Sequence, residues 1–404
     1  MSKPFALILY GATSFVGKLT AEYLHQRHGS GGDLKWAIAG RSKSKLAQLQ
    51  TELDADLPVV VADSADAASL TAMVRQANVI LSTVGPYMQY GRELVAACVR
   101  EGVDYLDLTG EVPFVRQMMD AHATDANTSG ARIIHCAGFD SIPSDLGVFF
   151  INAAAQERFG ESVVKVDTHV ESFAGGFSGG TVASMMGLVK GAKEDSTIDA
   201  FMKDPYAVCP QGMRSGPQQP DQERTFYDPD LKTWVAPFIM AAVNTRVVLA
   251  TNALLNYPYT KDFVYAERMA MSNAMAAYGV TAGLGLLQAG LGSAVGRTVL
   301  GAVALPKPGQ GPSPRAQAAG HFSFRIHAQT AGGKRLTAVV TGDRDPGYGS
   351  TSKQFAEAGL CLLQDISRSK VSGGFWTPAA ALGSALIERL TKHAGLTFDI
   401  VESD

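Results

Sequence analysis

Apolar and polar positions along the first third of the chain fall into short blocks that alternate in length and pattern. Residues 5–10 form an unbroken apolar run of strand length, which is typical of a strand buried on both faces of a parallel sheet. Helical and strand-like blocks then follow one another. The predicted strands are residues 5–10, 35–39, 58–62, 79–84, 105–107 and 132–136, and the predicted helices are residues 17–28, 43–53, 67–76, 93–101 and 112–125. This alternation predicts an α/β fold with a doubly wound parallel sheet.

A second unit follows residue 140. Pro143 suits the first turn of a helix that we expect to run to Arg158. Further segments then predict an inserted α+β domain with strands at residues 163–173, 321–329 and 335–342 and a helix at residues 181–190. Five prolines from Pro205 to Pro229 predict a long irregular loop, which lies either on the surface or across the site.

The C-terminal part returns to helical patterns. Thr351 and Gln354 have the spacing of a capping box before a helix that ends near residue 365. Thr377 and Pro378 start another helix, which Gly395 closes. We expect these helices to pack back on the first domain. The predicted division is therefore residues 1–145, residues 146–345 and residues 346–404.

Residues 269–296 carry no charged side chain and are rich in glycine. Their length would permit a membrane span, but the glycines and polar side chains dilute the mean hydropathy. Three interpretations stay open: a span, a peripheral contact with lipid, or a helix that is buried or lies on a homodimer face.

Composition narrows the class of partner. Charged residues make up 18% of the chain and the net charge is −3, which excludes gross disorder and provides no basic surface for nucleic acid. The four cysteines and eight histidines form no metal-binding motif, so we expect no metal. The N-terminus has the pattern of a first strand rather than a signal peptide. A cytoplasmic protein that binds a small molecule fits best, and lipid contact would place it at the inner face of a membrane.

A glycine-containing turn between the first strand and the first helix predicts dinucleotide binding. Gly11 allows the tight turn, Gly17 allows close packing of the helix, and the free N–H groups of the helix start receive the pyrophosphate. Ser14 stands where glycine is commoner, and its hydroxyl is a candidate phosphate donor. The candidate cofactor residues here are Gly11, Ala12, Thr13, Ser14, Phe15, Val16 and Gly17.

The end of the second strand indicates which dinucleotide is bound. A site selective for NAD has an acidic residue there for the ribose 2′-hydroxyl, but this chain has Gly40, Arg41 and Ser42. Arg41 can bind a 2′-phosphate, with Lys45 close by, so we predict NADP(H). Later strand ends supply further candidate cofactor residues: Asp63 near the adenine, and Ser82, Thr83, Val84, Gly85 and Pro86 beside the nicotinamide.

Four segments in combination resemble the saccharopine dehydrogenase-like oxidoreductases, and most of all their trans-acting enoyl reductase branch. They are the segments 11–17, 84–91, 105–111 and 138–145, and further likenesses at 175–181, 307–312, 343–348 and 375–380 extend over nearly the whole chain. The resemblance implies a Rossmann domain with an inserted α+β domain, NADP(H) as cofactor, and reduction of a double bond in polyketide-derived lipids, a step of lipid and glycolipid biosynthesis. Ser14 departs from the family's commoner glycine.

A nicotinamide reductase needs few residues besides those that bind, because the cofactor carries the hydride. The candidate catalytic groups lie at strand ends: Tyr87, Asp140 and Ser141, with Tyr348 as a further proton donor. Tyr87 has the alternative role of a packing aromatic, Asp140 and Ser141 that of a helix cap, and the turn at Tyr348 that of a structural turn.

Three other functions stay open. A saccharopine-type amino-acid reductase would need paired arginines for two carboxylates, and the second domain shows no such pair. A non-catalytic NADP-binding protein could sit on a lipid surface through residues 269–296. Gly176 to Gly180 also match the G-x-S-x-G pattern of hydrolases, with Ser178 as nucleophile. The glycine-rich apolar stretch favours a long acyl substrate.

Overall fold

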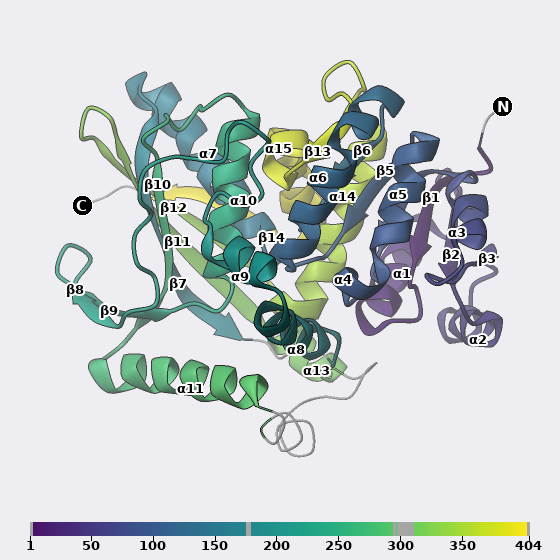
Figure 1. Cartoon of the computed structure of the whole chain (residues 1–404), viewed down its shortest axis with the longest axis horizontal. Coiled ribbons are helices and arrows are strands. Elements are labelled where there is room, and N and C mark those ends of the chain that lie inside the picture. Colours follow the sequence, from purple (N-terminus) through teal and green to yellow (C-terminus); the bar gives the residue numbers. More distant parts are fainter. Residues whose placement is uncertain (1–2, 175–178, 294–295, 297–310, 402–404) are drawn as a thin grey trace.

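A parallel sheet organises the N-terminal half of the molecule. The computed structural model describes residues 3–174, 179–293, 296 and 311–401 (Figure 1). The strand order in the first sheet is β13-β6-β5-β4-β1-β2-β3, and every pairing is parallel. Its strands are β1 (Phe5–Tyr10), β2 (Trp36–Gly40), β3 (Val59–Val61), β4 (Ala77–Ser82), β5 (Asp104–Asp107), β6 (Arg132–Ile134) and β13 (Gly374–Trp376). This order reverses between β1 and β4, which confirms the doubly wound prediction.

Helices connect and cover these strands. They are α1 (Phe15–His28), α2 (Lys43–Leu53), α3 (Ala67–Val74), α4 (Tyr87–Tyr90), α5 (Arg92–Glu101), α6 (Val112–Ser129) and, from the C-terminal part, α14 (Thr351–Gln364). α3, α5 and α6 pack in a row, whereas α14 packs on α1 and β4. The central strands are buried because helices lie on both sides, which is why their sequence is continuously apolar.

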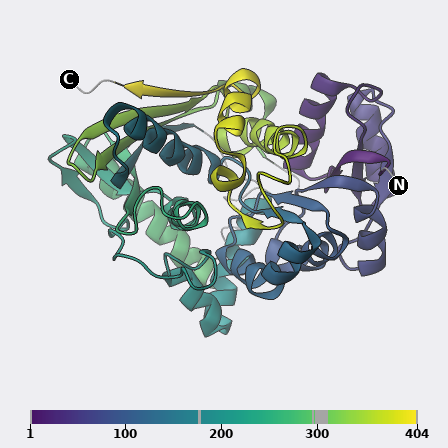
Figure 2. The ribbon, with the colours of Figure 1, turned by 90° about the horizontal axis from the view of Figure 1, so that it is seen from above.

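A second sheet forms the other half of the molecule, on the left in Figure 1, and Figure 2 shows the two halves side by side. Its strand order is β14-β12-β11-β7-β10-β9-β8, with only β7 and β10 paired in parallel among the described residues. The strands are β7 (Val163–Ala174), β8 (Phe226–Asp228), β9 (Thr233–Pro237), β10 (Val264–Met271), β11 (His321–Thr330), β12 (Arg335–Gly342) and β14 (Leu396–Val401).

The helices of this half include several that border the functional site. They are α7 (Ile142–Phe159), α8 (Gly179–Glu194), α9 (Ser196–Lys203), α10 (Ala241–Leu254), α11 (Ala274–Gly292), α13 (Pro314–Ala319), α15 (Pro378–Arg389) and the π-helical turns η1 (Pro346–Ser350) and η2 (Leu390–Ala394). α7 and α10 pack against the sheet and on each other. The predicted α/β fold with an inserted mixed domain is thus confirmed.

Two local predictions need correction. The charge-free segment 269–296 begins within β10 and becomes helical only at Ala274, because Asn273 caps the helix through the N–H of Ala276. Thr351 and Gln354 form no capping box, since a π-helical turn precedes α14 and the Thr351 hydroxyl donates to the Pro346 carbonyl.

The C-terminal part also differs from the prediction, because it consists of more than helices on the first domain. β13 joins the first sheet beside β6, and β14 pairs with β12 at the edge of the second sheet. The chain's last segment therefore joins the two halves. Residues 175–178, which include Ser178, and most of the 307–312 segment lie outside the described residues.

Candidate functional site

One large cavity extends from the carboxyl ends of the first sheet to the second half of the molecule. Its volume is about 1430 Å³. The walls come from the turn before α1, the loops after β2, β4, β5 and β6, and then α8, α10, α11 and the proline-rich loop before β8. A pocket for a drug-sized ligand has about 300–1,000 Å³. The cavity therefore has room for a dinucleotide and a second molecule.

The turn between β1 and α1 fits a pyrophosphate. Gly11 has φ +84°, and a Cβ there would lie 2.7 Å from both Thr83 Oγ1 and Val84 Cγ2. A Cβ on Gly17 would collide with the Gly11 carbonyl. Both glycines are thus required by the packing of α1 against β1 and the end of β4.

Donors at the start of α1 are available to a ligand. The backbone N–H groups of Thr13, Phe15 and Val16 have no acceptor among the described residues. Ser14 lines the cavity, and its hydroxyl also has partners within the protein. Its hydroxyl caps α1 by accepting from the Gly17 N–H at 2.9 Å, and it is hydrogen-bonded to Thr83 Oγ1 at 2.9 Å. The helix start therefore offers backbone donors that suit an anion.

Arg41 supplies positive charge at the nucleotide end. It is exposed, it lines the cavity beside Gly40 and Lys45, and no carboxylate of the described residues pairs with it. Ser42 caps α2 by accepting from the Lys45 N–H and does not line the cavity. These groups fit the 2′-phosphate of NADP(H).

Asp63 lies next to the cavity rather than in its wall. Its carboxylate accepts the N–H of Ala65, so it stabilises its own loop. The sequence did not indicate two wall residues at this end, Tyr10 and Ser64. Burial raises the pKa of Tyr10 to about 12, so its hydroxyl stays protonated. Tyr10 is the last residue of an apolar strand, and no pattern distinguished it from a core residue.

Tyr87 begins α4 and its hydroxyl is already bonded. The hydroxyl donates to the Ser82 carbonyl at 3.0 Å and accepts from the Leu108 N–H at 3.3 Å. Burial raises the pKa of this phenol well above its ordinary value. Glu111 holds the same turn, since its carboxylate accepts the N–H groups of Tyr87 and Met88 at 2.8 Å each. In this geometry Tyr87 joins the loops after β4 and β5.

Asp140 is the predicted catalytic residue that lines the cavity and can titrate near neutral pH. Burial raises the pKa of its carboxyl to about 6. The neighbouring Ser141 is fully buried and donates to Asn244 Oδ1 at 3.0 Å, and it makes no side-chain cap for α7. Ser141 therefore holds α7 to α10, while Asp140 lines the cavity, where it can meet a ligand.

Tyr348 lies deeper, in contact with the cofactor turn. Its ring packs edge-on against Phe15 with centroids 5.0 Å apart, and it is 2% exposed. Asp345 accepts the N–H groups of Tyr348 and Gly349 at 3.0 Å. The turn thus has a structural role, supporting the start of α1.

The two ends of the cavity differ in chemistry. Most predicted cofactor residues line it, namely Gly11, Thr13, Ser14, Phe15, Val16, Gly40, Arg41, Thr83, Val84 and Gly85. Ala12, Gly17, Ser42, Asp63, Ser82 and Pro86 do not line it. The opposite end has an apolar part, formed by Met185, Leu188, Val189, Met202, Phe238, Ile239, Met240, Val243, Leu284, Leu287 and Leu291. Polar and charged residues line it as well, among them Gln218, Gln219, Asp221, Gln222 and Glu223 of the proline-rich loop. The sequence did not indicate the contribution of α10, which was not predicted as a helix.

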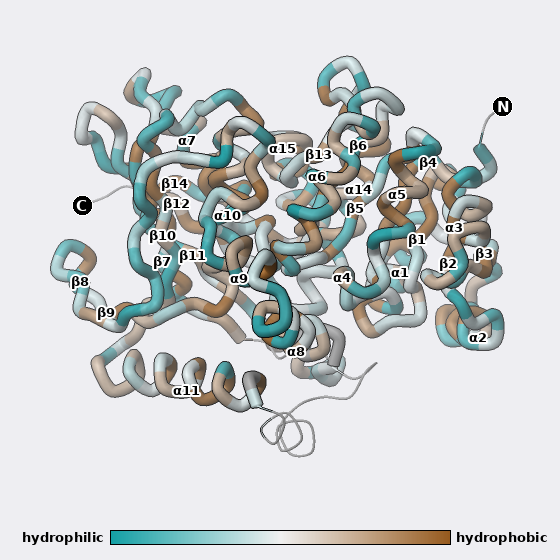
Figure 3. Tube along the Cα trace, in the orientation of Figure 1, coloured by the Kyte–Doolittle hydropathy of each residue, from teal (hydrophilic) through white to brown (hydrophobic). Residues whose placement is uncertain are grey.

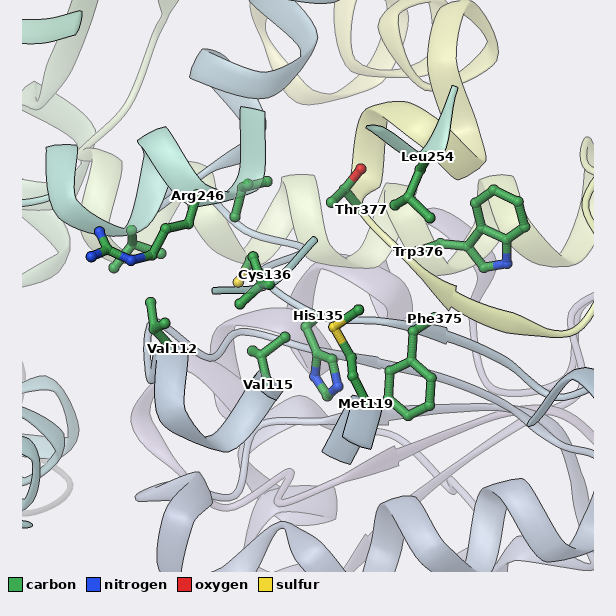
Figure 4. A pocket seen from close by; sticks show the side chains of 13 residues that line it. Val112, Val115, Met119, His135, Cys136, Arg246, Leu254, Phe375, Trp376 and Thr377 are labelled. Carbon is green, nitrogen blue, oxygen red and sulfur yellow. The ribbon is translucent and has the colours of Figure 1, made fainter. Parts of the chain in front are cut away.

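A small cavity of about 30 Å³ lies near the large one and shares Val243 and Arg246 with it (Figure 4). Its walls are mostly apolar, and it contains His135 and Cys136 from the end of β6. His135 Nδ1 is 2.7 Å from Asp107 Oδ2. Within residues 3–174, 179–293, 296 and 311–401, no group of three or more His, Cys, Asp or Glu side chains could hold a metal ion.

Comparisons with known proteins agree with this geometry. The family model "Saccharopine dehydrogenase NADP binding domain" matches residues 7–134. A Mycobacterium tuberculosis protein provisionally named as a trans-acting enoyl reductase is 41% identical over 403 residues, covering 96% of each chain. The "Trans-acting enoyl reductase" of Mycobacterium leprae is 38% identical over 409 residues, again covering 96% of each.

A solved structure shares the fold. Apo saccharopine dehydrogenase (L-Glu forming) from Saccharomyces cerevisiae superposes with a TM-score of 0.57 at 12% identity, covering 98% of this chain and 100% of that one. The cradle at Gly11, the N–H groups of α1 and the position of Arg41 fit the NADP that the family model names. The chain therefore belongs to the trans-acting enoyl reductase family and is an NADPH-dependent oxidoreductase with a saccharopine dehydrogenase-type nucleotide-binding domain.

Proposed function

We propose that the protein reduces a carbon–carbon double bond conjugated to a carbonyl in a long, lipid-like acyl substrate. One observation carries this proposal: the nucleotide end and the apolar end form a single cavity. NADPH supplies the hydride when it is bound. The apolar walls favour an alkyl chain over the charged backbone of an amino-acid substrate.

The chain's own residues then position the substrate and provide a proton. Tyr87 and Glu111 hold the loops after β4 and β5 in place. Asp140 follows β6 and has a raised pKa, so we assign it the proton that goes to the carbon next to the carbonyl. Hydride and proton together account for the two hydrogens that the double bond gains.

The test compares substrates on the purified full-length protein. NADPH consumption is followed with α,β-unsaturated acyl thioesters of increasing chain length and with saccharopine, and the product mass is measured. We expect thioester turnover that improves with chain length and a product two hydrogens heavier. Turnover of saccharopine alone would support the amino-acid reductase, and NADPH binding without turnover of either would support the non-catalytic alternative.

Two positions on α11 provide a matched pair of variants. Leu287 lines the cavity, whereas Ala282 is exposed and does not line it. Leu287→Gln should raise KM for the longest thioester by about tenfold, since it removes apolar contact with the chain. Ala282→Gln should leave KM unchanged for substrate in solution. An equal effect of both variants would contradict an acyl chain in this part of the cavity.

We also propose that the outer face of α11 contacts a lipid surface, as in a cytoplasmic protein bound to the inner face of a membrane. Residues 274–291 are long and apolar enough to cross a membrane, and only 11% of this stretch is buried. Met275, Tyr278 and Leu286 are 85%, 57% and 75% exposed. The helix lies along the molecule's edge in Figure 1, and apolar residues recur along it in Figure 3. Its inner side lines the cavity, so a peripheral position fits better than a span.

Flotation with vesicles tests this contact. The intact protein is expected to float with vesicles, and the pair Met275→Lys and Leu286→Lys to remain in the dense fraction. Val61→Lys is the control, because Val61 is 49% exposed on β3, at the far edge of the first sheet. Protein that stays dense in every case argues against lipid contact. Light scattering on the same samples detects the alternative occupant, a second copy of the chain.

A further inference from the structure

One buried cation in the cavity wall has no ion-pair partner among the described residues. Arg246, on α10, is 6% exposed. Its Nη1 and Nη2 groups donate to the carbonyls of Ala242 and Met202, and its Nε–H has no acceptor in the part of the chain that the structure describes. Burial lowers the pKa of this guanidinium to about 10, which still leaves it charged at neutral pH.

Two other buried arginines are compensated. Arg132 binds Asp104 at 2.5 Å, and Arg268 binds Asp167 at 2.9 Å. The charge of Asp204 acts on Arg246 and raises the pKa of the guanidinium. The Asp204 carboxylate nevertheless accepts the N–H of Tyr206 at 2.8 Å and forms no ion pair with the guanidinium. A buried charge without a partner is costly, so its retention requires another reason.

The position of Arg246 provides that reason. Arg246 lines the large cavity, about one helical turn after Val243. Val243 itself lies close to the loop after β5, because a Cβ added to Gly110 in that loop would be 3.8 Å from Val243 Cγ2. Arg246 also borders the small cavity, and Figure 4 places it on the opposite side of that cavity from Trp376. The phosphates of the dinucleotide have their own donors at α1 and Arg41. Arg246 therefore presents a positive charge to the substrate half.

We propose that Arg246 binds an oxyanion of the substrate, a carboxylate or a phosphate ester attached to the acyl chain. This inference deepens the function proposed above and rests on it. The guanidinium would then anchor the charged end of the substrate, while the apolar walls contact the chain. A neutral lipid of equal length would lack the anchor and leave the buried charge uncompensated.

The test measures binding of saturated probes, which requires no turnover. Calorimetry on the full-length protein with saturating NADP compares decanoate, decyl phosphate and decanamide. We expect at least one anionic probe to bind more tightly than decanamide by about tenfold or more, the value of a hydrogen bond to a charged group. The tighter of the two anions identifies the source of the oxyanion.

Variants assign the preference to this side chain. Arg246→Met should remove the difference between the probes, and Arg246→Lys should retain part of it. The control is Lys203→Met, since Lys203 also lines the cavity but is paired with Asp199. The NADPH affinity of every variant is also measured, because a variant that still binds NADPH is folded.

Two results would overturn the inference: equal binding of all three probes to the unmodified protein, or an anion preference that survives Arg246→Met. The first is decisive even where a variant does not fold. An anion preference without enoyl turnover would leave Arg246 as an anion site and refute the proposed reaction instead.

Discussion

At the residue scale, the side chains at strand ends differ in their hydrogen bonds rather than in position alone, since Tyr87 lines the cavity as Arg41 and Asp140 do. Tyr87, Ser141 and Asp63 use their polar atoms within the protein. Arg41 and Asp140 line the cavity, and neither forms an ion pair within the described residues. Sequence spacing identified all five equally, because each follows a strand. Only the hydrogen bonds separate the two roles.

Arg41 should determine cofactor choice. In Arg41→Asp the 2′-phosphate loses a charged donor and meets a carboxylate, so we expect NADPH affinity to fall by about tenfold to a hundredfold. NADH affinity should change little. Calorimetry measures both, and Lys43→Asp, an exposed change of equal charge on α2 outside the cavity wall, is the control. Equal losses for NADPH in both variants would mean that Arg41 makes no specific contact.

Asp140 should impose a pH dependence on turnover. Its pKa is raised to about 6, and the protonated form is the donor, so kcat should fall as the pH rises through that value. Asp140→Asn should lower kcat by about a hundredfold, in the range of a lost general acid, and abolish this limb of the profile. NADPH affinity should be unchanged. Persistence of the limb in Asp140→Asn would assign the proton to another group.

At the scale of elements, the contact between α1 and β1 depends on missing side chains. Gly17 is buried, and a Cβ would collide with the Gly11 carbonyl. Ser14 replaces a glycine at this turn and provides the cap, since its hydroxyl accepts the Gly17 N–H. Ser14 can therefore replace the glycine that is commoner in the family, because its side chain caps α1.

Gly17→Ala should destabilise this junction. Overpacking of this kind lowers the free energy of unfolding by about 1–3 kcal/mol, which chemical denaturation can measure. Gly31→Ala is a suitable control, because Gly31 is exposed and a Cβ added there would meet nothing within 4 Å. A stability loss of the same size in Gly31→Ala would show that the effect is not one of packing.

At the scale of the whole molecule, buried carboxyl groups join α7 to β10 and to α15. Ser144 on α7 donates to Glu267 Oε1 on β10 at 2.7 Å, and Asp145 accepts the N–H of Ala379 at the start of α15. Burial raises the pKa of each carboxyl to about 7. Both groups are therefore more easily neutral in the folded protein than in the unfolded chain.

The burial of these two carboxyl groups predicts that the free energy of unfolding declines as the pH rises. The unfolded pKa values are about 4, so the favourable contribution is complete below that pH and is lost as the pH rises through about 7. Melting temperatures should therefore fall between about pH 4 and pH 7 and level off above that range. Glu267→Gln should reduce the slope, while Glu93→Gln, an exposed change, should not. A slope unaffected by Glu267→Gln would place the dependence elsewhere.

Sequence by itself determined the doubly wound sheet, the cofactor turn and the choice of NADP, because buried parallel strands, tight turns and phosphate binding restrict residue types locally. Tertiary structure alone decided the rest. β14 has no pattern that distinguishes one sheet edge from another, and it pairs with β12 directly after η2 ends. The roles of Tyr87 and Asp140, and the isolation of Arg246, depend on neighbours distant in sequence, since hydrogen bonding and burial are properties of the packed chain.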